Sequence, residues 1–295
     1  MSSPFEQTRS TGWLNHPRFA ISVDVEDYFQ VWAFSDCITR QSWDEFPLRV
    51  GETTRRCLDM FDEAGTKATF FTLGWVGERD KALIRDIVSR GHELASHGYD
   101  HAKVNTLTSD AFYEDVRKTK MLLEDIGGVE VRGFRAAGFS IDNTTPWAYE
   151  RLEDAGYHYS SSSHPIAHDH YGDDSAPQTP HKPDENGNIV EAPVATQTLL
   201  GRRVSCAGGG WFRAIPYTFS KSLINRAASD LDGPVIFYFH PWEIDVDQPR
   251  MKQASAKSRL RHYLNLRGMQ PKLEKLLDEF QWGRVDDVLG LEKVT

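Results

Sequence analysis

The sequence Phe19-Ala20-Ile21-Ser22-Val23-Asp24-Val25-Glu26-Asp27 joins a short apolar strand to a cluster of three carboxylates. Three acids within four residues concentrate like charge, which is unfavourable unless a cation lies nearby. A metal ion together with an arginine would provide that compensation. Side chains alternate between the two faces of a strand, so Asp24 and Glu26 share one side.

The same arrangement, a strand followed by a polar segment and a helix, recurs along the chain. Strands are predicted at residues 67–73, 92–95, 131–135, 157–159 and 234–239, and helices at 53–64, 78–90, 108–126, 146–154 and 272–280. This alternation is typical of an α/β fold with a mostly parallel sheet or barrel. In such folds the chemistry gathers at the carboxyl ends of the strands.

Candidate site residues follow several of these predicted strands. His97 and His101 lie four positions apart after the strand at 92–95, and together with a carboxylate they form the ligand set of a catalytic zinc-type site. A second carboxylate would then be free to act as a general base. Arg135 and His240 also follow predicted strands. Each alone is more simply a structural residue, but as members of this set both are expected at the site.

Composition limits the possible functions. The 295 residues carry a formal charge of −9, which argues against nucleic acid as the main partner. The three cysteines, Cys37, Cys57 and Cys206, suggest neither a disulfide framework nor a cysteine zinc site. The first residues lack the apolar core of a secretory signal, and no apolar run is long enough to cross a membrane. We therefore expect a cytoplasmic location.

Domain organisation follows from the same patterns. Residues 1–16 are polar and aperiodic, which predicts a mobile leader. Residues 17–295 are expected to form a single domain. Within it, residues 161–215 are rich in turn-forming residues and predict a long irregular insertion over the active-site face.

Six sequence segments together resemble the polysaccharide deacetylases of the NodB-homology class, carbohydrate esterase family 4. They are residues 22–31, 96–101, 133–135 with 139–141, 165–172, 208–213 and 239–245. The resemblance covers about residues 18–285 and is greatest to the branch found with bacterial exopolysaccharide and exosortase gene clusters. It implies a distorted (β/α) barrel and hydrolysis of N-acetyl groups from amino-sugar units of an exopolysaccharide or its precursor.

The resemblance also implies roles for individual residues. Asp24 matches the catalytic base, Arg135 the arginine that tethers this base, and His240 the general acid. His97 and His101 match the metal-binding histidines.

The third metal ligand is left open between Glu26 and Asp27, and strand alternation favours Glu26. We expect one divalent metal ion, zinc, as the cofactor. Its partner would be an N-acetylated amino-sugar polymer or oligomer, with contacts from Phe139, His168, Asp169, Trp211 and Trp242.

Two positions depart from the family pattern. Ala137 stands where relatives usually have proline, and Ser160 stands where many have aspartate. They leave open a carbohydrate-binding relative with weakened catalysis. A metal amidohydrolase acting on a small amide is a second alternative, although the long segment after residue 161, with its aromatic residues, favours an extended sugar.

Overall fold

The computed structural model describes residues 18–167 and 172–291, and its centre is a curled parallel sheet. Eight short strands make up this sheet: β1 (Phe19–Val25), β2 (Thr69–Thr72), β3 (Glu93–Ser96), β4 (Gly133–Phe134), β5 (Tyr159–Ser160), β6 (Val190–Glu191), β9 (Val235–Phe239) and β10 (Trp282–Gly283). All of the pairings in this sheet are parallel.

Strand β1 is an internal strand of the sheet, since both of its edges are paired. One edge pairs with β9 from Phe19 to Val23. On the other edge, β10 pairs with the first residues of β1, and β2 pairs from Ser22 onwards. The predicted apolar strand is therefore buried on both sides, which fits its run of small and aliphatic residues.

The far edge of the sheet curls back toward β9. Beyond β6, the Ala195 N–H donates to the Ile236 carbonyl of β9 (3.1 Å), and the Tyr238 N–H of β9 donates to the Ala207 carbonyl (2.9 Å). These bonds bring residues after β6 against β9. The distorted (β/α) barrel predicted from the sequence is confirmed.

Alternation along the strands separates the interior of the barrel from its outer layer. Ala20, Phe71, Ala95 and Ile236 face an inner apolar cluster, which Val285 of the short helix α11 (Val285–Val288) joins. Ion pairing fixes this helix, because Asp286 Oδ2 accepts from Arg132 Nη2 at 2.5 Å. The helix lies at the amino-terminal ends of the strands, so the opposite end is left for the polar residues.

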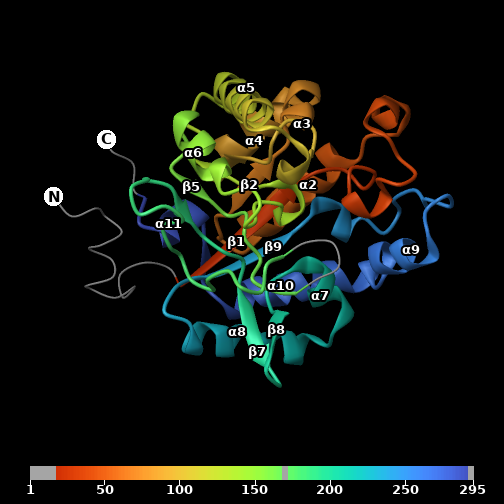
Figure 1. The fold of residues 1–295 in the computed structure, drawn as a ribbon. Coiled ribbons are helices and arrows are strands. Elements are labelled where there is room, and N and C mark those ends of the chain that lie inside the picture. Colours follow the sequence, from red (N-terminus) through yellow and green to blue (C-terminus); the bar gives the residue numbers. More distant parts are fainter. Residues whose placement is uncertain (1–17, 168–171, 292–295) are drawn as a thin grey trace.

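Helices pack on the outside of the sheet in two groups (Figure 1). One group contains α3 (Gly74–Arg79), α4 (Lys81–Ser89), α5 (Ser109–Gly127) and α6 (Trp147–Asp154). The other contains α7 (Gly209–Ala214), α8 (Tyr217–Asp230) and α10 (Met269–Glu279). Helices α2 (Val50–Glu63) and α9 (Ala256–Tyr263) complete the set. Odd-numbered residues of β1, among them Ile21 and Val23, pack into this outer layer.

Two features differ from the sequence expectations. The single helix predicted at 78–90 is two helices, α3 and α4, because Asp80 leaves the helical conformation and caps α4 by accepting from the Leu83 N–H (2.9 Å). The segment 161–215 contains an antiparallel hairpin of β7 (Thr196–Leu199) and β8 (Arg202–Ser205).

The predicted leader at residues 1–16 lies outside the described residues, and the single-domain organisation stays a prediction. Among the described residues, no helix has the length and apolar character needed to cross a bilayer.

Gly133 of β4 generates a prediction about stability. A Cβ at this position would overlap the ring of Tyr159, which is fully buried and held by a hydrogen bond from its hydroxyl to Glu93 Oε1 (2.8 Å). Gly133→Ala should therefore lower the free energy of unfolding by about 1–3 kcal/mol, the usual effect of overpacking. Gly210→Ala is the matched control, because its Cβ would meet no atom within 4 Å. Denaturant unfolding of both variants checks this, and equal stability would contradict it.

Candidate active site

The candidate site lies where the inward-facing side chains leave the carboxyl ends of the strands. Asp24 and Glu26 continue the inward series of β1, His97 follows Ala95 of β3 by two positions, and His240 follows Tyr238 of β9 by two positions. Because β9 pairs directly with β1, His240 meets both carboxylates: its Nε2 lies 3.4 Å from Glu26 Oε1 and 4.0 Å from Asp24 Oδ2.

Glu26, His97 and His101 form a cluster that could hold a metal ion, since their ligand atoms all lie within 4.8 Å of one another. The Nδ1 of His97 lies 2.8 Å from the Arg135 carbonyl, which fixes the proton on that nitrogen and leaves Nε2 free as a ligand. Burial lowers the pKa of His97 to about 4, so the ring is neutral near neutral pH. A neutral imidazole is the form that binds a metal.

The other two members of the cluster also fit a cation. Glu26 Oε2 is buried and lies 2.9 Å from His101 Nε2. Burial alone would raise the pKa of Glu26, but the nearby His101 and His240 outweigh it and lower the pKa to about 2. An ionised carboxylate and two imidazoles that converge in this way match the donor set of a zinc-type site.

The loop that carries His101 needs unusual backbone angles. Gly98 has a φ of 74° and His101 a φ of 59°, both in the left-handed region that favours glycine. Two hydrogen bonds hold the loop against α3, from the Gly74 N–H to the Gly98 carbonyl and from the Trp75 N–H to the Tyr99 carbonyl (both 2.9 Å). Strain at a fixed loop of this kind is characteristic of functional sites.

Asp27 has a different environment from Glu26. Its carboxylate turns to the start of α2 and accepts from the N–H groups of Arg49 (2.7 Å), Val50 (2.9 Å) and Tyr28 (2.8 Å). Burial raises the pKa of Asp27 to about 6, although these hydrogen bonds oppose the change. The sequence left two candidates for the third metal ligand, Glu26 and Asp27. In the structure Glu26 lies beside the histidines, whereas Asp27 accepts hydrogen bonds from the N–H groups at the start of α2.

Arg135 is fully buried and ties Asp24 to the neighbouring strands. Its Nη1 donates to Asp24 Oδ1 (2.7 Å) and to Ser22 Oγ (2.8 Å), while Nε and Nη2 donate to the carbonyl and hydroxyl of Ser161. The guanidinium also lies 4.1 Å from the centre of the Phe71 ring. This network fixes the orientation of the Asp24 carboxylate.

A buried pair, Glu243 and Arg213, orients His240 through the ring nitrogen Nδ1. This Nδ1 lies 2.8 Å from Glu243 Oε1, and Glu243 Oε2 accepts from Arg213 Nε at 2.6 Å. Burial lowers the pKa of His240, but the charges of Glu26, Glu243 and Asp24 outweigh this and raise it to about 9. The imidazole is therefore protonated near neutral pH, and its Nε2 proton faces the site.

The predicted substrate contacts have separate locations. Trp242 is only 8% exposed: its indole N–H donates to Glu26 Oε1 (3.3 Å), and its ring stacks between His240 and His262. Phe139 is buried against the Tyr238 ring, and Trp211 of α7 is 44% exposed. His168 and Asp169 lie outside the described residues.

Sequence reasoning missed the residues that support the site. Glu243, Arg213 and Ser161 were not among the expected site residues, and neither was Ser22 as a partner of Arg135. The sequence contains a weak signal for Glu243, which lies three positions after His240. At this spacing, one helical turn brings its carboxylate to the imidazole ring of His240.

The two departures from the family pattern have local partners. Ser160 Oγ donates to Ser162 Oγ (2.7 Å), and Ser162 Oγ accepts from the Ala136 N–H (2.9 Å). Ala137 is buried. The backbone beside Arg135 is therefore hydrogen-bonded without a proline or an aspartate at these positions.

Comparison with known proteins gives consistent matches. Residues 39–160 match the family described as polysaccharide deacetylase, and residues 161–290 match a domain of unknown function, DUF3473. A peptidoglycan-N-acetylglucosamine deacetylase of Bacillus cereus is 29% identical over 101 residues, which are 34% of this chain and 37% of that protein. A peptidoglycan deacetylase-like protein of Gibberella zeae is 32% identical over 129 residues, 43% of this chain and 37% of that protein.

The fold extends the likeness beyond the matched sequence. A structure assigned to a polysaccharide deacetylase of Mycobacterium smegmatis superposes with a TM-score of 0.60 at 18% identity, covering 95% of this chain and 92% of that one. The sequence matches themselves span little more than a third of the curated relatives.

The two adjacent carboxylates generate a prediction about metal binding. Glu26→Gln should remove bound divalent metal, because Glu26 contributes a ligand oxygen to the cluster. Asp27→Asn, the matched control, should retain metal but lose about 1–2 kcal/mol of stability, because it weakens the cap of α2. Elemental analysis and denaturant unfolding measure both. Metal loss in Asp27→Asn with retention in Glu26→Gln would reverse the assignment.

Proposed function

This chain belongs to the polysaccharide deacetylases, carbohydrate esterase family 4, and from this premise we propose that it is a metal-dependent N-deacetylase acting on amino-sugar units of an exopolysaccharide or its precursor. The observation that carries the proposal is the convergence of Asp24, His240 and the Glu26–His97–His101 cluster at one end of the barrel. Two imidazoles and a carboxylate favour zinc as the metal.

Glu26, His97 and His101 would hold the ion. A divalent ion there would polarise the acetyl carbonyl and lower the pKa of a water molecule. Asp24 is suited to take a proton from the attacking water, because Arg135 binds only one of its oxygens in the described structure and Oδ2 faces His240. Arg135 keeps this carboxylate oriented.

His240 is suited to complete the reaction. Water adds to the carbonyl carbon, the carbon–nitrogen bond breaks, and the leaving nitrogen needs a proton. The protonated Nε2 of His240, which Glu243 orients through Nδ1, can donate it. The products are acetate and a free amine on the sugar.

Two observations support a polymeric amino sugar as the substrate. Trp211 lies exposed on α7 and offers a flat apolar face of the kind on which sugar rings pack. The Bacillus cereus and Gibberella zeae relatives are both named for peptidoglycan, an N-acetylated amino-sugar polymer. No observation favours a small amide.

Acetate release from N-acetylglucosamine oligomers tests the proposal. We expect release by the purified protein, loss after treatment with a chelator, and recovery when zinc is restored. Oligomers that release no acetate with metal-loaded protein would contradict the proposed activity.

Asp24→Asn should retain metal but lose at least about 100-fold in turnover, the lower range for removal of a general base. The amide can still accept from Arg135, so the network around it remains. Acetate release and elemental analysis are measured on the same sample. Loss of metal together with activity would reassign Asp24 as a ligand.

Glu243→Gln should move the alkaline limb of the pH–rate profile to lower pH by about one unit or more. Glu243 stabilises the protonated form of His240, so its neutralisation lowers the pKa of His240, and the proton donor is lost at lower pH. Gln can still accept from His240 Nδ1, which keeps the ring in place. A lower rate at every pH with an unchanged limb would indicate a structural role instead.

A further inference from the structure

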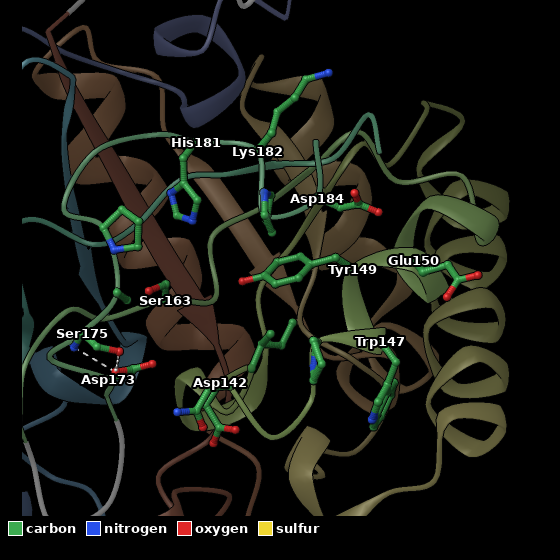
Figure 2. Close-up of a pocket in the computed structure, with 16 residues that line it drawn as sticks. Asp142, Trp147, Tyr149, Glu150, Ser163, Asp173, Ser175, His181, Lys182 and Asp184 are labelled. Atoms are coloured by element: carbon green, nitrogen blue, oxygen red, sulfur yellow. Dashed lines mark hydrogen bonds between the residues drawn. The ribbon is translucent and has the colours of Figure 1, made fainter. Parts of the chain in front are cut away.

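The described part of the structure contains a hollow of about 620 Å³, and Figure 2 shows the residues that line it. The residues that bear its chemistry are Asp142, Trp147, Tyr149, Ser163, Asp173 and His181. They come from the segment that enters α6 and from the chain between β5 and β6. The size is within the range of small-molecule sites in proteins.

The hollow opens on the same rim of the barrel as the candidate site. Residues 141–150 follow β4, and Ser163 follows β5, so both arise from carboxyl ends of strands. Ser163 is only two positions after Ser161, which binds Arg135. A polymer that crosses this rim can therefore reach both places.

Hydrogen bonds hold the chain at Ser163 and His181, which line the hollow. The buried Glu191 accepts from the N–H groups of Ser162 and Ser163 through Oε1 (both 2.9 Å). His181 pairs with Glu191 through two backbone hydrogen bonds. The chain beside the hollow therefore continues from the end of β5, where Ser161 binds Arg135.

Aromatic rings and hydroxyl groups give the hollow the character of a sugar site. The first turn of α6 supplies Tyr149, and Figure 2 shows its hydroxyl directed toward the side of Ser163 and His181. The ring of Trp147 packs edge-on against Phe112, with 5.7 Å between the ring centres. Burial raises the pKa of Tyr149 well above its ordinary value, so the phenol stays neutral. Aromatic faces combined with a few fixed polar groups are typical of ligand pockets.

The charge of the hollow distinguishes between kinds of sugar. Its lining has four carboxylates, Asp142, Glu150, Asp173 and Asp184, but a single lysine, Lys182. Asp142 and Asp173 each use Oδ1 to close a local turn, with Thr144 and Ser175 respectively. Neither forms an ion pair with another described residue, and the hollow therefore favours a cation over an anion.

We propose that this hollow is a second sugar subsite, which binds an already deacetylated, positively charged amino-sugar unit of the same polymer. The proposal rests on the proposed function, because deacetylation creates the ammonium group that the carboxylates would bind. Subsite occupancy would hold a partly deacetylated chain on the enzyme while a neighbouring unit enters the candidate site. Asp173 and His181, which lie outside the matched deacetylase region, would then contribute to the choice of substrate together with Asp142.

Calorimetric titration with a glucosamine oligomer tests the subsite, because this probe carries no acetyl group and is not turned over. At mildly acidic pH we expect metal-loaded protein to bind it more tightly than a neutral glucose oligomer of equal length, and the difference should shrink as salt is added. The double variant Asp142→Asn, Asp173→Asn should weaken binding of the glucosamine oligomer by roughly fivefold and leave the glucose oligomer unchanged.

The Asp→Asn changes remove charge but keep the oxygen that closes each turn, so the loops should remain folded. Asp278→Asn, on the exposed face of α10 at the opposite end of the barrel, is the matched control and should bind like the parent protein. Equal binding of charged and neutral oligomers, unchanged binding by the double variant, or equally tight binding of a linear polyamine would overturn the proposal.

These outcomes are independent of catalysis. If the proposed activity fails, N-acetylated oligomers release no acetate while the glucosamine oligomer still binds the hollow. If the subsite alone fails, acetate is released but the double variant and its parent have the same KM for partly deacetylated oligomers.

Discussion

The buried contacts of Arg135 organise the candidate site. Its side chain binds Ser22 and Asp24 from β1 and Ser161 beyond β5, while its backbone carbonyl fixes His97 beyond β3. A buried guanidinium is costly unless its donors are satisfied and its charge is balanced. Ser22, Asp24 and Ser161 satisfy the donors of Arg135, and Asp24 balances its charge. Together with the contact to His97, these bonds connect residues at the ends of β1, β3, β4 and β5. Asp24 and His97 are therefore oriented by the same residue.

The three carboxylates of the β1 terminus show how environment separates chemically similar groups. Asp24 meets a guanidinium, Glu26 meets two histidines, and Asp27 meets the N–H groups at the start of a helix. Neighbouring charges favour the ionised form, and burial opposes it. The pKa values of Glu26 and Asp27 accordingly move in opposite directions, to about 2 and about 6.

The opposite side of the site has its own support. Glu243 holds His240 through Nδ1, Arg213 holds Glu243, and Trp242 lies between the His240 ring and that of His262 while its N–H contacts Glu26. His240 and Glu26 thus share one supporting tryptophan. A side chain expected from the sequence to contact substrate instead connects two parts of the site.

The sequence by itself determined the alternating strands and helices, the barrel, and the strand ends at which Asp24, His97, Arg135 and His240 lie. These follow from local periodicity, since inward and outward residues of a strand alternate strictly. Only the tertiary structure brought Glu26, and not Asp27, to His97 and His101. It also placed the Glu243–Arg213 pair behind His240 and brought Ser163 and His181 to one hollow. Such choices depend on contacts between segments far apart in the chain, and no local pattern encodes them. Burial and charge then set the role of each group, because both are properties of the assembled surroundings.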